Sequence, residues 1–381
     1  MKSRTTLLAA GGALLALVAI VGFIALPNGV QRSAAGPSSR ARQSDPLDGQ
    51  TPLPSPSTPL PSPQTVPAFS LLSSIELVFA KLLRGDGSAS DLLMLKRGLS
   101  SAPPREAITA ITTFLESGRD AKTGQEFTLG AGGALEGAPT LRVFLLDLLG
   151  SLARSIRSDE AAAIASTILE SKASSAEWAI SLRNIAWNDP NAAPFLSGKI
   201  REMLSYEPWL QSPDAGMLEA FDVAVFTRDP TLIAPLADAL RSDRPPLQRA
   251  AAIALDRLAE RAPLEVMTYL NANPGAMADR PFVRADYFAK ADLAQPAQRQ
   301  AVEIYLRRPD VASAEKAKLV EAFATPASFV SESLLTTAVP EPDEATRNAT
   351  IATVASEWLA KSQFPELQRQ IAELRERMTV P

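Results

Sequence analysis

The chain has 381 residues, with 38 lysines and arginines against 42 aspartates and glutamates, and it contains neither histidine nor cysteine. The missing side chains exclude Ser-His-Asp and Cys-His catalysis, histidine and thiolate metal sites, and disulfides. A formal net charge of −4, with both signs interspersed along the chain, argues against a nucleic-acid-binding surface.

Residues 1–26 predict a membrane anchor. Lys2 and Arg4 precede an uncharged run, and residues 7–26 are long and apolar enough to cross a hydrocarbon core about 30 Å thick as a helix. A cleaved secretory signal is the alternative, although its apolar region usually has about 7–15 residues. The positive-inside rule favours a cytoplasmic N-terminus. We therefore expect a single-pass membrane protein with its body in the periplasm or outside the cell.

Residues 27–68 predict a disordered Pro/Ser-rich linker. Prolines alternate there with Ser, Thr and Leu, as at Pro59, Pro61 and Pro63. Each proline fixes its own φ and removes a backbone donor, so the segment should be extended and solvated. We interpret it as a spacer between the membrane and the body, and a docking segment for a polyproline-binding groove is the alternative.

Beyond Phe69, apolar residues recur at steps of three and four, which places one apolar face on each predicted helix. The pattern predicts an all-α body, with an N-terminal helical part over residues 69–138 and a repeat domain over residues 139–381. The clearest stripes begin at Leu141, Trp178, Leu196, Met217, Ile233, Leu247 and Ile351, and a C-terminal stripe at Leu367, Ile371, Leu374 and Met378 is expected to pack on the Trp358 helix.

Residues 124–139 form a Gly-rich interruption of this helical pattern. The run from Gly130 to Gly133 superficially resembles a phosphate-binding loop. No Gly-Lys-Ser/Thr follows it and no predicted strand frames it, so we expect a flexible loop.

Helix starts are predicted from capping signals. Ser174 with Glu177 fits a capping box, in which each side chain satisfies a free backbone donor. Three further pairs place a capping acceptor directly before a proline at the first helical position. These pairs are Asp189-Pro190, Ser212-Pro213 and Asp229-Pro230.

Two of these starts, Asp189-Pro190 and Asp229-Pro230, lie forty residues apart with one further start between them, which is the period of a helical-repeat solenoid. Residues 229–259 resemble a HEAT or bilin-lyase-type repeat, and residues 189–226 resemble a looser copy. Asp229 and Pro230 match the family's helix start, Leu236, Ala237 and Leu240 its first apolar face, and Arg249, Ala250, Ala251, Ala254, Leu255 and Leu258 its second helix. The resemblance implies an irregular α-α solenoid.

Aromatic residues concentrate between Trp178 and Trp209. Trp178 lies on its helix's apolar stripe, so we assign it to the core. Stacked repeats form surfaces on which tryptophan and tyrosine supply large contact areas. Trp187, Tyr206 and Trp209 are therefore the candidate partner-binding residues.

The chemistry that remains identifies no catalytic, cofactor-binding, metal or small-molecule site. Adjacent acids such as Asp159-Glu160 fall at predicted helix starts, where they favourably meet the helix dipole. We expect a membrane-tethered helical-repeat scaffold that binds a protein partner in the cell envelope and is not an enzyme. The alternatives are an all-helical envelope hydrolase using paired carboxylates and a structural spacer.

Overall fold

The computed structural model describes residues 68–325, 333–337, 339 and 343–379. The predicted anchor and the linker as far as residue 67 lie outside the described residues. By its internal contacts the chain divides into Met1–Pro61 and Ser62–Pro381, and everything described belongs to the second unit. Within the described ranges, no helix combines the length and the apolar character that crossing a membrane requires.

The described chain is all-helical apart from one small hairpin, which confirms the predicted fold class at this level. The first half contains α1 Ala68–Arg84, α2 Ala89–Ser101, α3 Pro104–Glu116, β1 Thr128–Leu129, η1 Ala131–Gly133, β2 Leu135–Gly137, α4 Leu141–Ile156, α5 Glu160–Ile168, α6 Ser175–Asn188, α7 Ala193–Leu204 and α8 Glu207–Gln211. The second half contains α9 Ala215–Ala220, α10 Asp222–Thr227, η2 Pro230–Leu232, α11 Ile233–Ala239, α12 Pro245–Arg261, α13 Pro263–Ala272, α14 Pro281–Phe288, α15 Pro296–Arg307, α16 Ser313–Ala322, α17 Glu344–Ala360, η3 Pro365–Leu367 and α18 Gln368–Thr379.

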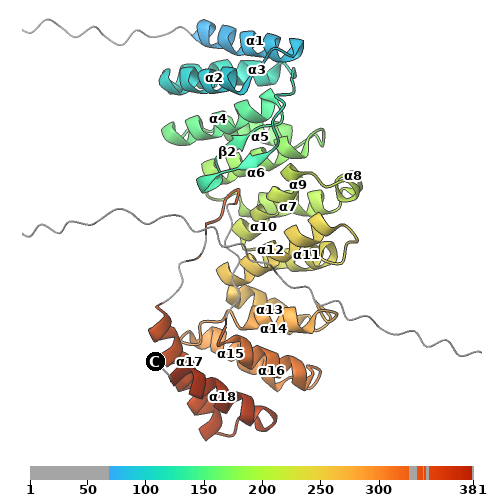
Figure 1. Cartoon of the computed structure of the whole chain (residues 1–381), viewed down its shortest axis with the longest axis vertical. Helices are drawn as coiled ribbons and strands as arrows, with labels where there is room; N and C mark the ends of the chain where they lie inside the picture. Colours follow the sequence, from blue (N-terminus) through green and yellow to red (C-terminus); the bar gives the residue numbers. More distant parts are fainter. Residues whose placement is uncertain (1–67, 326–332, 338, 340–342, 380–381) are drawn as a thin grey trace, which may run out of the picture. The chain divides into compact units, whose positions relative to one another are not determined.

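The described helices pack mainly against neighbours one to four helices away along the chain (Figure 1). One continuous line of contacts runs from α1 through α3, α4, α6, α9, α12, α14 and α16 to α18, with α10 packed against both α9 and α12. A second set of contacts joins α7 to α10 and α11, and α13 to α15. Each helix therefore buries its apolar face against successive neighbours rather than around one shared centre.

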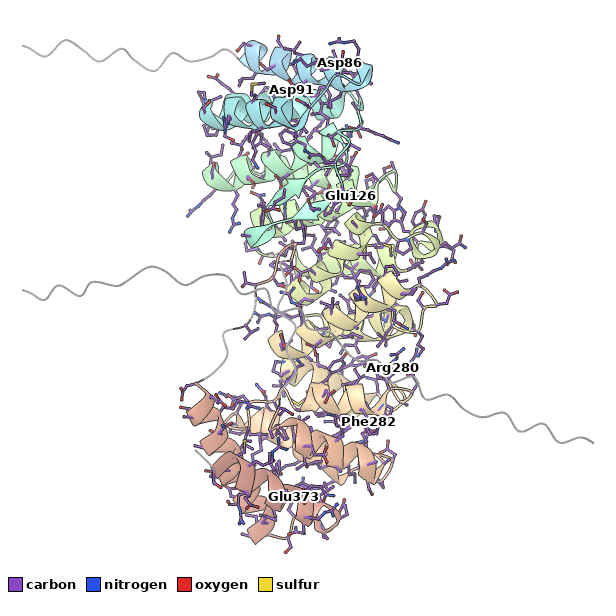
Figure 2. The ribbon with its side chains drawn as sticks, in the orientation of Figure 1. Asp86, Asp91, Glu126, Arg280, Phe282 and Glu373 are labelled. Carbon is purple, nitrogen blue, oxygen red and sulfur yellow. The ribbon has the colours of Figure 1, made fainter. Side chains whose placement is uncertain are left out.

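Several helix ends follow the predicted capping chemistry. The Ser174 side chain accepts a hydrogen bond from Glu177 N and starts α6, but the Glu177 carboxylate accepts from Arg142 rather than completing the predicted capping box. Asp229 accepts from Thr231 N and starts η2. At the first turn of α2, Ser88 and Asp91 form a complete capping box, and the Asp91 carboxylate also accepts from Lys81 Nζ of α1 at 2.6 Å (Figure 2). Local sequence therefore determines where these helices begin.

Two predicted starts are wrong by a few residues. Asp189 ends α6 and binds the Asn191 amide, while α7 begins only at Ala193. Asp214, rather than Ser212, caps α9 by accepting from the Met217 amide. Proline follows both predicted acceptors, Asp189 and Ser212, but at each place the chain completes a turn before the next helix starts.

The Gly-rich interruption is also corrected, because it folds as a hairpin rather than as an irregular loop. Strands β1 and β2 pair antiparallel, with Thr128 opposite Gly137, and η1 forms the tip. Gly133 has φ +76°, a left-handed conformation that favours glycine. The hairpin rests on α4 through a hydrogen bond from Leu135 N to an Asp147 carboxylate oxygen at 3.3 Å.

The predicted C-terminal packing is confirmed. Helix α18 packs on α17, and Leu367, Ile371 and Leu374 of the stripe are buried. Trp358 of α17 is fully buried against Phe364, with ring centroids 5.5 Å apart. The last helices therefore close the stack through an apolar contact read directly from the spacing of the sequence.

Candidate functional site

Buried and half-buried ion pairs connect helices along the stack. Four of them link an acid and a base about 35 residues apart in the chain, a separation close to one helix pair, and the buried pair Arg284–Glu315 spans 31 residues. The four pairs are Arg142–Glu177, Asp147–Arg183, Asp222–Arg257 and Asp256–Lys290, with nitrogen–oxygen distances of 2.9, 2.8, 3.3 and 2.9 Å. Because burying an unpaired charge is costly, these pairs favour one register between neighbouring helix pairs.

The Asp222–Arg257 pair also holds a distant piece of chain, residues 333–337, which we call the strap (Figure 1). One Asp222 carboxylate oxygen accepts from the Leu335 and Thr336 amides, both at 2.7 Å. The other accepts from the Thr336 hydroxyl. Asp222 begins α10, so the strap bonds to a helix more than a hundred residues earlier in the chain.

Arg257 of α12 completes this contact from the neighbouring helix. Its guanidinium donates to the Thr336 carbonyl at 2.9 Å and to the hydroxyls of Ser333 and Thr336. Arg261, one turn further along α12, donates to the Thr337 carbonyl at 2.7 Å. The two helices thus bind the strap through its main chain and its hydroxyl groups.

The hairpin tip contacts the strap on the side away from Asp222 and Arg257. A Cβ added to Gly133 would lie closer than 3.0 Å to the Leu334 carbonyl oxygen, so glycine permits the close approach. Arg183 donates to the Gly133 carbonyl at 2.8 Å and fixes the tip, while Leu334 is fully buried. We call the space bounded by Gly133, Asp222 and Arg257 the strap groove.

Three aromatic residues between Trp178 and Trp209 pack together, namely Trp178, Tyr206 and Trp209. Trp209 packs edge-on against Trp178 at 5.3 Å and against Tyr206 at 5.1 Å, which holds α8 on α6. Trp178 is buried as predicted, and Tyr206 and Trp209 are half-buried. Two of the candidate partner-binding residues therefore share one surface.

Two lysines lie over these rings. Lys172 Nζ is 5.5 Å from the Tyr206 ring, and Lys199 Nζ is 5.5 Å from the Trp178 ring and 5.9 Å from the ring of Phe195, which is 43% exposed. Such geometry is favourable because the ring face carries negative charge density. The aromatic–lysine patch, as we call this surface, comprises Lys172, Phe195, Lys199, Tyr206 and Trp209.

Trp187, the third candidate residue, belongs to a different set of contacts. Its ring lies 4.1 Å from the Arg183 guanidinium carbon and 5.2 Å from that of Arg154. It therefore flanks the buried Asp147–Arg183 pair at the end of α6. The sequence spacing of the three candidates did not reveal this separation, because it depends on which helix faces meet.

A cavity of about 510 Å³ opens near Trp178, and none of the five patch residues lines it. Trp178 lines it together with polar groups that include Ser171 and the paired side chains of Arg142 and Glu177. Arg142 donates to both Glu177 carboxylate oxygens, at 2.9 and 3.2 Å. Ligand pockets typically have about 300–1,000 Å³ and a few fixed polar groups, so this cavity can receive side chains of a bound partner.

Carboxylates relevant to the hydrolase alternative lie near the strap groove. Burial, and secondarily the charge of Asp222, raises the pKa of Glu219. Both oxygens of Asp222 accept hydrogen bonds from the strap. The carboxylates of Glu219 and Asp222 are therefore not jointly available to a substrate while the strap is bound. Among the described residues, no group of three or more acids is arranged to hold a metal ion.

The comparisons with known proteins return nothing: no family model, curated protein or solved structure matches the chain. Function must therefore be argued from the molecule itself.

Sequence reasoning missed the strap groove altogether. Its residues carry only weak local signals, namely the charged Asp222 before an apolar run, Arg257 beside the apolar stripe of its helix, and the pair Leu334-Leu335 between helices. Arg183 gives a similar signal, because it directly follows Leu182 on the apolar helix that also carries Trp178, and the structure buries it fully. A charge within an apolar stripe indicates a buried ion pair, but it does not identify the partner.

Proposed function

We propose that this protein is a membrane-tethered helical-repeat scaffold that binds a protein partner in the cell envelope. The apolar run at residues 7–26 and the Pro-rich segment after it support the tether and its spacer. Lys2 and Arg4 support a cytoplasmic N-terminus, and hence a body in the periplasm or outside the cell.

We further propose that the body is an irregular HEAT-like solenoid. The line of contacts from α1 to α18 supports this, because each helix packs on successive neighbours. The buried ion pairs support it independently, since acids and bases about 35 residues apart join equivalent places in successive helix pairs.

The aromatic–lysine patch is the observation that carries partner binding. Phe195 exposes 43% of its surface, and Tyr206 and Trp209 are half-buried and pack edge-on against each other. Tyrosine and tryptophan dominate the energetics of protein interfaces because they bury large areas with few rotatable bonds. Both lysines already pair with Glu202, so the rings rather than a free charge would supply most of the contact with a partner.

The test is capture of partners by the full-length protein from detergent-solubilised native membranes, with Phe195→Ala compared against Phe282→Ala. Phe282 of α14 is a matched control because it is 54% exposed and lies away from the patch (Figure 2). We expect one stoichiometric partner whose capture falls about tenfold in Phe195→Ala alone, equivalent to about 1.4 kcal/mol. Equal capture by both variants would remove the patch from the proposal, and no reproducible partner would favour the structural spacer.

A further inference from the structure

We propose that the strap groove is a second binding site, specific for an extended segment of a partner protein, and that residues 333–337 occupy it as an internal ligand. The inference goes beyond the proposed function, because the groove and the aromatic–lysine patch share no residues. The ligand it fits has a hydroxyl residue, a leucine, any residue and a threonine in sequence, followed by an acidic residue.

The groove recognises main chain first. Asp222 accepts two successive amides, Arg257 donates to the Thr336 carbonyl, and Arg261 donates to the Thr337 carbonyl. Every non-proline residue offers these groups, so any extended segment without proline at those positions could form them. Binding an extended peptide through its backbone is a recurrent mode of recognition between proteins.

Two strap side chains supply the selectivity. Leu334 is fully buried beneath the hairpin tip, so the site requires an apolar residue there. The Thr336 hydroxyl donates to Asp222 and accepts from Arg257, so both polar partners depend on it. An analogue that lacks a hydroxyl at this position would leave buried polar groups unpaired.

The two charged residues of the groove need hydrogen-bond partners from a bound segment. The Asp222 and Arg257 side chains are only 6% and 5% exposed, and their mutual contact at 3.3 Å leaves several hydrogen-bonding positions of each to the strap. Buried charges need those positions satisfied. If the strap leaves, another segment of the same chemistry is therefore strongly favoured to replace it.

Charge favours a partner segment over the strap at one end. Arg228 and Arg257 lie close enough to Arg261 that, after burial, their repulsion lowers the pKa of Arg261. The Nε of Arg261 is buried without a hydrogen-bond partner among the described residues. Thr337 binds Arg261 through its main-chain carbonyl, and its exposed side chain is neutral. A carboxylate at this position would pair with Arg261, so an acidic ligand should outcompete the strap.

The experiment measures fluorescence anisotropy of a labelled peptide with the sequence of residues 331–339, added to the full-length protein in detergent. The strap is weakened by the double substitution Leu334→Ser/Thr336→Val, and Val339→Ser is the matched control, because Val339 lies in the same segment and is 41% exposed. A tethered segment acts at millimolar effective concentration, so it suppresses binding in the parent protein. We expect at least tenfold tighter binding by the weakened variant alone, and tighter binding still when the peptide carries Thr337→Glu.

A second pair of variants tests where the peptide binds. Gly133→Ala, added to the weakened protein, should abolish peptide binding, because its Cβ would collide with the backbone at the Leu334 position. Gly132→Ala should not, because a Cβ there meets no atom within 4 Å although φ is similarly positive at +67°. Equal effects of the two substitutions would overturn the assignment of the peptide to the groove.

Folding is monitored by circular dichroism and gel filtration. A folded weakened variant that binds the peptide no better than the parent protein would overturn the proposal. If that variant does not fold, Thr336→Val alone removes only the hydroxyl, and we expect about threefold tighter binding. Failure of Thr336→Val to fold would show that the strap is an integral part of the fold. A dimer formed by the weakened variant would assign the groove to a second copy of this chain. Either result would overturn the proposal that a partner segment binds there.

Discussion

Replacing Asp147 by asparagine should destabilise the stack severely. Asp147 pairs with Arg183 at 2.8 Å, and the two side chains are 9% and 0% exposed. Burial lowers the pKa of Arg183, and the charge of Asp147 is the main opposing influence. Removing that charge leaves a buried guanidinium uncompensated, which costs about 3–5 kcal/mol of the free energy of unfolding.

The assay is urea unfolding of the full-length protein in mild detergent, followed by circular dichroism and tryptophan fluorescence. Trp187 lies 4.1 Å from Arg183, so its emission should report the local change. The matched control is Asp279→Asn, which breaks an ion pair with Arg241 at 3.1 Å whose side chains are 47% and 45% exposed. An exposed pair contributes only about 0–1 kcal/mol, so this control should remain close to the parent protein.

A double-mutant cycle isolates the interaction between the two charges. The combination Asp147→Asn/Arg183→Met removes both charges, so it should be more stable than the sum of the single changes predicts by about 2 kcal/mol. Additive effects, or a loss in Asp147→Asn no larger than in the exposed control, would refute the argument that Asp147 compensates the buried charge of Arg183.

Three further predictions follow from packing, ionisation and capping. Gly216→Ala should lower the free energy of unfolding by about 1–3 kcal/mol, because its Cβ would lie 2.5 Å from the Ala176 backbone on α6. Gly198→Ala is the control: its Cβ meets no atom within 4 Å, so it should stabilise α7 by about 0.5–1 kcal/mol in the same thermal melts. Burial raises the pKa of Asp256 to about 6 against an ordinary 3.8, so the unfolded carboxyl ionises first. The parent protein should therefore lose stability relative to Asp256→Asn as pH rises from 4 to 6, and a difference independent of pH would contradict this. Ser88→Ala removes the cap of α2 and should cost about 0.5–2 kcal/mol, while Ser88→Thr keeps the hydroxyl that caps α2 and binds Asp91 and should therefore stay close to the parent protein if the capping argument is correct.

The candidate site was only partly predictable. The concentration of aromatic residues after Trp178 is visible in the sequence, and Tyr206 and Trp209 do share a surface. Trp187 follows Trp178 on the same helix, yet it contacts Arg183 and Arg154 instead. Helical spacing predicts which residues of one helix share a face, but it says nothing about which neighbouring helix covers that face.

Turns between helices were less predictable than helix interiors. Asp189 and Ser212 both precede proline and resemble helix caps, but α7 begins at Ala193 and α9 begins at Ala215, after its cap Asp214. Several acceptors in each turn can bind a free amide, and small differences in local packing decide which one does.

The sequence by itself determined the helical class, most helix positions and the packing of α18 on α17, because these depend on apolar periodicity and on capping within a few residues. Only the tertiary structure decided the pairing of Asp147 with Arg183, the fold of the Gly-rich hairpin and the burial of the strap between Gly133 and Asp222. The ion pair and the strap contacts join residues about 35 to more than 100 positions apart. Their partners are selected by the way stacked helices bring charges and backbone together, which no local pattern encodes.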